Sequence, residues 1–86
     1  MGQREKFIIK ILSGANDNNI FFDDICNLLY AFDFSSRIKG SHHIFYRNDI
    51  EEILNIQSKN GKAKSYQVKQ IRNIIIKYKL GGNIDV

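Results

Sequence analysis

The chain has 86 residues, of which 43% are hydrophobic and 12% aromatic, and it carries a formal net charge of +4 with an isoelectric point of about 9.3. A chain this short buries only about 60 to 65% of its unfolded surface, which allows one modest core and excludes a second lobe. The apolar content excludes a disordered chain. We therefore expect a single domain over residues 1–86.

No apolar run approaches the roughly 18 to 20 residues that cross a bilayer, and the opening MGQREKF has charges where a secretory signal has its apolar stretch. We therefore expect a cytoplasmic protein without a membrane partner. The single cysteine, Cys26, has no partner for an internal disulfide and no metal-ligand spacing around it. It is interpreted as a small apolar core residue.

Two helices are predicted in the first third of the chain. Residues 4–12 carry apolar side chains at helical spacing, and the SGANDNN segment that follows is a stop and turn signal. Residues 22–32 form a second amphipathic pattern with a period of about 3.6 residues. Asp23 and Asp24 fall in the first turn of this helix, where negative charge meets the positive end of the helix dipole.

From Ser35 onward the apolar period changes to two, which predicts strands at 37–39, 41–47 and 52–57, with turns near 40 and at 48–49. Residues 58–65, SKNGKAKS, are predicted to be a loop, with Ser65 as the N-cap of a last helix that ends at Gly81 and Gly82. The predicted fold is therefore α+β, a three-stranded antiparallel sheet packed on one face by helices, with its other face open.

The segment KGSHHIFYR, residues 39–47, holds both histidines of the chain. Histidine has an unperturbed pKa of about 6.5, and general acid or base catalysis by such a group supplies roughly 10² to 10⁴ in rate. Structural histidines on a strand are the ordinary alternative. Because successive side chains of a strand point to opposite faces, His42 and His43 cannot both serve one site or chelate one ion. No metal and no small-molecule cofactor is predicted.

The last third of the chain has a single sign of charge. Between residues 59 and 79 there are seven lysines and arginines and no acid. Loop lysines followed by a helix start are a combination that receives phosphates, which favours an anionic partner such as RNA. The alternative is a solvated helix face whose long side chains cover the core.

Other polar residues carry weaker signals. The acidic pairs at 23–24 and 51–52 are sequence neighbours that do not face each other, so neither is predicted to be a hydrolase dyad. Ser41 and His42 point in opposite directions and make a poor nucleophile and base pair. Asn55 and Gln57 alternate on the third strand and could contact RNA, although polar residues on an exposed sheet face are common.

The segment GSHHIF, residues 40–45, resembles the signature of HicA toxins of bacterial type II toxin–antitoxin systems. The resemblance extends over residues 21–80: FFDDICNLLYAFDF resembles the first helix of the family, the stretch up to EILNIQ its strands, and GKAKSYQVKQIRNIIIKYKL its last helix. Residues 1–20 form an N-terminal helical extension absent from the shortest members. Residues 31–34 stand where the family usually has a Leu-Gly-Phe corner.

The resemblance implies a fold like that of double-stranded RNA-binding domains and a ribonuclease activity that acts on mRNA and halts translation in the bacterial cytoplasm. It also implies inhibition by a HicB-type antitoxin protein. The key histidine of the family directly follows Gly-Ser or Gly-Gly, which is His42 in this sequence. His43 fills a position that varies in the family and is the second choice.

The resulting hypothesis is metal-free cleavage of mRNA, in which His42 moves the proton of a ribose 2′-OH or of the leaving oxygen. The candidates for contact with the RNA phosphates are Lys39, Ser41, Arg47, Lys62 and Lys64. Two alternatives remain open at this stage. One is a non-catalytic binder of double-stranded RNA with the same fold, and the other is a protein interaction module whose basic face docks an acidic partner.

Overall fold

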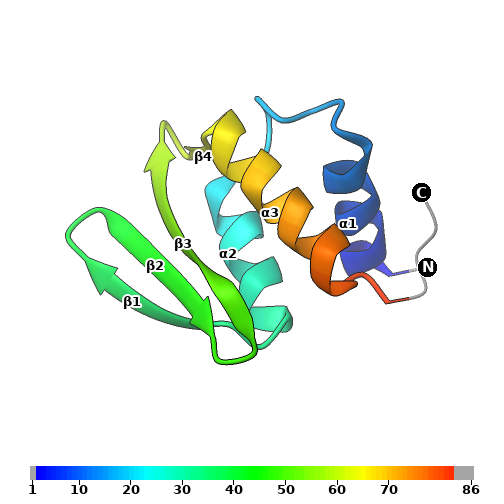
Figure 1. Cartoon of the computed structure of the whole chain (residues 1–86). Helices are drawn as coiled ribbons and strands as arrows, with labels where there is room; N and C mark the ends of the chain where they lie inside the picture. The colour runs from blue at the N-terminus through cyan, green and yellow to red at the C-terminus, as the bar shows by residue number, and fades with distance from the viewer. Residues whose placement is uncertain (1, 83–86) are drawn as a thin grey trace.

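The computed structural model describes residues 2–82 and has three helices and one four-stranded antiparallel sheet, shown in Figure 1. This confirms the α+β class. In chain order the elements are α1 (Gln3–Ser13), α2 (Phe22–Ala31), β1 (Ser35–Lys39), β2 (His42–Arg47), β3 (Ile50–Lys59), β4 (Lys62–Ala63) and α3 (Ser65–Tyr78). Among residues 2–82, no helix combines the length and the apolar character that crossing a bilayer requires.

The prediction of three strands followed by a loop at 58–65 was wrong, because this segment contains a fourth, short strand. β3 continues to Lys59, and the chain turns back at Asn60 and Gly61 to form β4, so that the sheet order is β1-β2-β3-β4. Asn60 and Gly61 have φ angles of 54° and 80°. An Asn-Gly pair accepts positive φ at both positions, which is why it favours a two-residue hairpin over an open loop.

The ends of α3 also differ from the prediction. The helix begins at Ser65, and the capping residue is Lys64, whose backbone N–H donates to Gln67 Oε1 at 3.2 Å. At the other end Lys79 adopts a left-handed conformation with φ of 55°, before the two glycines that were expected to end the helix. Leu80 then packs against the core. A hydrophobic contact of this kind commonly accompanies a helix C-terminus that is closed by a residue in the left-handed conformation.

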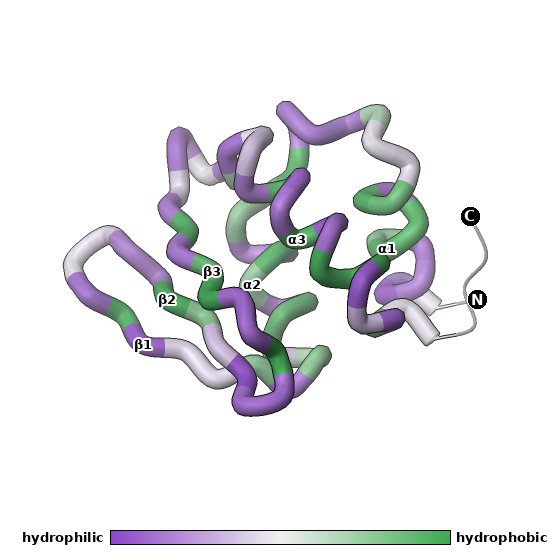
Figure 2. Tube along the Cα trace, viewed as in Figure 1, coloured by the Kyte–Doolittle hydropathy of each residue, from purple (hydrophilic) through white to green (hydrophobic). Residues whose placement is uncertain are grey.

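The core lies between the helices and one face of the sheet, where the apolar segments of Figure 2 meet. Its fully buried side chains come from all three helices and from β2 and β3, and include Ile11, Ile25, Leu29, Phe45, Leu54, Ile56, Val68 and Ile71. Cys26 also lies in this core, and burial raises the pKa of its thiol to about 11. The thiol therefore stays protonated at neutral pH, which agrees with its interpretation as an apolar core residue.

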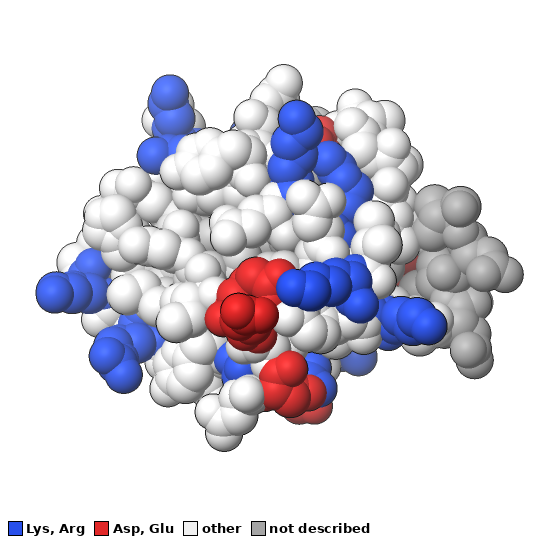
Figure 3. Space-filling view, in the orientation of Figure 1, with Lys and Arg blue, Asp and Glu red and all other residues white. Residues whose placement is uncertain are grey.

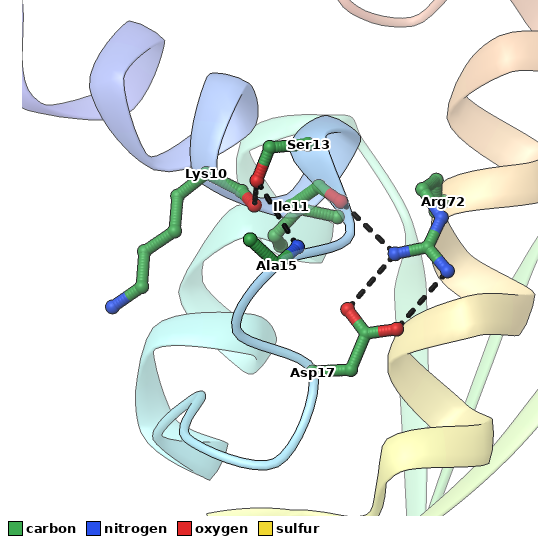
Figure 4. A network of polar contacts seen from close by, with 6 residues as sticks. All are labelled: Lys10, Ile11, Ser13, Ala15, Asp17 and Arg72. Atoms are coloured by element: carbon green, nitrogen blue, oxygen red, sulfur yellow. Dashed lines mark hydrogen bonds and ion pairs between the residues drawn. The ribbon is translucent and has the colours of Figure 1, made fainter.

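The N-terminal extension is fixed to α3 by an ion pair with little exposure to solvent. Arg72 Nη1 and Nη2 donate to the two carboxylate oxygens of Asp17 at 2.9 and 3.0 Å, and Nη1 also donates to the carbonyl of Ile11 at 3.2 Å (Figure 4). The side chains of Asp17 and Arg72 are 16% and 15% exposed. A bidentate ion pair of this kind fixes the orientation of the two side chains as well as the distance between them.

The extension is also joined to the sheet through its backbone. The N–H of Ala63 donates to the carbonyl of Ile20 at 2.9 Å, and the N–H of Phe22 donates to the carbonyl of Gly61 at 3.0 Å. The chain entering α2 therefore runs antiparallel beside β4. Residues 2–20 are thus an integral layer of the domain.

Replacing Asp17 by Ala is expected to lower the free energy of unfolding by about 2 to 3 kcal/mol, because it leaves a nearly buried guanidinium without its carboxylate. Urea unfolding followed by circular dichroism measures the change. The control is Lys77→Ala, which breaks the more exposed pair with Glu52 and is expected to cost much less. Equal losses in the two variants would contradict a special role for the Asp17–Arg72 pair.

Candidate functional site

Strand pairing places His42 in the middle of a row of polar side chains that crosses the sheet. Lys39 of β1 is the register partner of His42, and His42 is the partner of Gln57 in β3. Lys64 follows β4 and donates from Nζ to Gln57 Oε1 at 3.4 Å. We call Lys39, His42, Gln57 and Lys64 the cross-strand row. With neighbouring strands about 4.8 Å apart, Lys39 lies one strand from His42, and Lys64 lies on the other side, two strands away beyond Gln57.

The row lies on the face of the sheet that no helix covers. Phe45 of β2 and Leu54 of β3 are fully buried against the helices, and side chains alternate along each strand. His42 and Asn55 accordingly point to the opposite face and are exposed. The predicted open face is therefore present, and it carries His42.

His43 points toward the helices, as strand parity predicted. Its ring meets the ring of Phe22 edge-on, with the centroids 4.9 Å apart and the planes at 77°. Its Nδ1 atom is buried and has no hydrogen-bond partner among residues 2–82. The second-choice histidine is thus a packed side chain beneath the sheet, on the other side from His42.

The ring of His42 is held by a partner on the next strand. Its Nδ1 atom lies 3.0 Å from Asn55 Oδ1. Because an amide oxygen only accepts, the Nδ1 atom carries the proton in this arrangement and the Nε2 atom is left as the acceptor of the neutral ring. From the sequence, Asn55 was predicted only as a possible RNA contact. Its place beside His42 depends on the β2–β3 register, which alternation alone does not give.

Ser41 belongs to the same site. Gln57 Nε2 donates to Ser41 Oγ at 3.0 Å while Gln57 Oε1 accepts from Lys64 Nζ. A chain of hydrogen bonds therefore links the turn before β2 to the start of α3. Lys62 begins β4, two residues before Lys64, and is the register partner of Lys59 in β3. Four of the five phosphate contacts predicted from sequence, at Lys39, Ser41, Lys62 and Lys64, lie on the open face or its border.

The fifth, Arg47, lies elsewhere. It is at the end of β2, roughly 16 Å from His42 at about 3.3 Å per residue. Its Nη1 donates to the carbonyl of Phe32 at 2.8 Å, and its Nε lies 2.7 Å from Asp49 Oδ1. Arg47 therefore ties the end of α2 to the sheet and is not brought together with the cross-strand row.

The one-sign surface expected for the last third of the chain is smaller than the sequence suggests. Arg72 pairs with Asp17, and Lys77 Nζ donates to Glu52 Oε2 at 3.0 Å. The hydrogen bonds from Tyr78 and Lys77 hold the pKa of the Glu52 carboxyl below its ordinary value. In Figure 3 most of the acidic side chains in view lie in the lower middle, beside basic side chains of α3, and further basic side chains stand beside the β1–β2 hairpin and near the β3–β4 turn.

Replacing His43 by Phe is expected to raise the free energy of unfolding by about 1 kcal/mol, because it removes a buried nitrogen without a partner and keeps an aromatic ring against Phe22. Urea unfolding again measures the change, with His42→Ala on the open face as the control that should alter stability little. A marked loss of stability in His43→Phe would show that the imidazole nitrogens are needed in the core.

Within residues 2–82, no three or more His, Cys, Asp or Glu side chains are grouped in a way that could hold a metal ion. The chemical groups present at the site are the imidazole of His42, the ammonium groups of the lysines, the hydroxyl of Ser41 and the amides of Asn55 and Gln57. Comparison of the chain with protein-family models, with curated proteins and with solved structures finds no match.

Proposed function

We propose that this chain is a HicA-type toxin: an mRNA interferase that binds RNA, cleaves it without a metal by acid–base chemistry at His42, and is neutralised by a HicB-type antitoxin. The observation that carries the proposal is the cross-strand row, which sets an exposed histidine between two lysines. The resemblance of residues 21–80 to the family supports it independently. A fold like that of double-stranded RNA-binding domains is part of the proposal, and the helices on one face of the antiparallel sheet support it.

In the proposed reaction, His42 Nε2 accepts the proton of a ribose 2′-OH, and the freed oxygen attacks the adjacent phosphorus. The bond from phosphorus to the 5′ oxygen breaks, and that oxygen takes up a proton from solvent. His42 then gives the proton that it took from the 2′-OH to solvent. The products are a 2′,3′-cyclic phosphate and a 5′-OH. DNA lacks the nucleophile and is not cut.

The neighbours of His42 have separate parts in this reaction. Asn55 holds the ring with its Nε2 acceptor available, and this makes it a positioning residue. Lys39 and Lys64 supply ammonium groups for the oxygens of the phosphorane, whose charge exceeds that of the substrate phosphate. Gln57 and Ser41 keep Lys64 in the row through their hydrogen bonds.

The test is incubation of the purified chain with a structured mRNA in EDTA, followed by analysis of the fragment ends. The wild type is expected to cut and to leave cyclic phosphate ends, whereas His42→Ala is expected to lose about 100-fold or more in rate. His43→Phe is the matched control, because it changes the adjacent histidine on the opposite face and should keep the activity.

Each contrary outcome has a definite meaning. Equal cleavage by the wild type and His42→Ala would contradict the assignment of His42. RNA binding without cleavage by the wild type would indicate a non-catalytic RNA-binding domain. Phosphate contacts make the logarithm of the binding constant fall with the logarithm of the salt concentration, with a slope of about −0.7 per contact on single strands. Absence of RNA binding at every salt concentration would therefore indicate a protein interaction module.

The HicB-type antitoxin is proposed to cover the open sheet face. Beyond the row, this face has a shallow hollow whose walls include Ile44, Tyr46 and Ile53, and the side chain of Ile53 is 63% exposed. Such apolar exposure beside a polar site suits a protein partner. A partner seated there would also cover His42.

Protection of His42 from chemical modification tests whether the antitoxin covers the open sheet face. Diethyl pyrocarbonate is expected to modify His42 in the free chain and much less in the complex with the cognate antitoxin, as measured by peptide mass spectrometry. His43, which packs beneath the sheet, is the internal control and should react weakly in both samples. Unchanged reactivity of His42 in the complex would contradict the proposed docking face.

A further inference from the structure

A groove opens beside the cross-strand row, where three segments that are distant in sequence meet. It is bounded by the end of β3 with β4, the first turn of α3, and the loop that precedes α2. Gln57 belongs both to the row and to the wall of the groove, so the groove continues directly from the site around His42. Its lining includes Asn18, Gln57, Lys59, Lys62, Lys64 and Tyr66.

The charge of this groove is positive and has no acid to balance it. Lys59, Lys62 and Lys64 line it, and no aspartate or glutamate does so among the described residues. None of these lysines takes part in the salt bridges found within residues 2–82. Cationic side chains converging without a counter-charge favour an anionic occupant with more than one charge.

Tyr66 indicates that the occupant also contains an aromatic group. Its side chain is 60% exposed at the start of α3, although this helix buries its apolar stripe against the sheet. A ring exposed beside lysines offers a flat surface on which an unpaired base can stack. Bases of a duplex are stacked inside the helix and are not accessible in this way, so the combination favours a single strand.

Asn18 brings the N-terminal segment into the same groove. It directly follows Asp17, which is bound to Arg72, and precedes Ile20, whose carbonyl accepts a hydrogen bond from the N–H of Ala63. The segment is therefore anchored on both sides of Asn18. A side-chain amide offers one acceptor and two donors, which suits contact with the edge of a base.

We infer that this groove binds one nucleotide of a single-stranded RNA, next to the nucleotide on which His42 acts. Its phosphate lies among the lysines, its base stacks on Tyr66, and Asn18 lies at the edge of that base. The inference rests on the proposed function and deepens it, because it assigns a single-stranded substrate and gives the N-terminal extension a part in binding it.

The test measures binding of a labelled single-stranded oligoribonucleotide by fluorescence anisotropy at several salt concentrations, in EDTA and with the His42→Ala change present in every variant to prevent cleavage. Tyr66→Ala is expected to weaken binding about ten-fold or more with an unchanged salt slope, because a ring contacts the base and not the phosphate. Tyr66→Phe should keep the affinity. Lys62→Gln should instead reduce the slope by about 0.7.

Two matched controls make the test specific to the groove. Ile76→Ala removes a side chain of the same helix with the same 60% exposure and should leave binding unchanged. Asn18→Asp and Asn16→Asp add the same charge to the same loop, but only residue 18 lines the groove. Asn18→Asp is expected to weaken binding several-fold more than Asn16→Asp.

The outcomes separate this inference from the proposed function. If the wild type cuts RNA but Tyr66→Ala behaves like Ile76→Ala, or the two loop variants are equal, the groove does not hold the substrate and the proposed function stands. Tighter binding of a duplex than of a single strand would overturn the single-stranded substrate class. If no RNA is bound at all, both the inference and the proposed function fail.

Discussion

The pairing register of β2 with β3 is the constraint on which the site depends. Phe45 is paired with Leu54, both are fully buried, and each contributes about 1.5 to 3 kcal/mol through the apolar surface that it removes from water. A slip of β2 by one residue would expose Phe45 and turn His42 toward the helices. The same packing energy that closes the core therefore holds His42 on the open face beside Asn55.

Charge pairing over long sequence distances removes part of the basic surface on α3. Asp17 and Glu52 neutralise Arg72 and Lys77 on α3, while the lysines at the β3–β4 hairpin form no salt bridge within residues 2–82. Among the described residues, the lysines of this hairpin therefore keep their positive charge unpaired next to the cross-strand row. The Asp17–Arg72 pair also fixes the loop that carries Asn18, so one interaction links the stability of the N-terminal layer to the shape of the proposed RNA groove.

Local signals were sufficient wherever the pattern repeats over several residues. The helical period predicted α1 and α2, the change to a period of two predicted β1 to β3, and strand parity separated His42 from His43. The shorter features were missed, because a two-residue strand has no period. β4 follows from the Asn60-Gly61 turn and from pairing with β3, and the early end of α3 at Lys79 follows from the packing of Leu80.

The sequence by itself determined the α+β class, the open sheet face and the histidine that lies on it, because alternation within a strand is a property of neighbouring residues. Only the tertiary structure decided which side chains stand around His42. Asn55 reaches it through strand register, and Lys64 reaches its neighbour Gln57. Arg47 instead contacts Phe32 and Asp49, and Asn18 joins the groove through the Asp17–Arg72 ion pair, which spans 55 residues. Such contacts join residues far apart in the chain, and no local pattern encodes them.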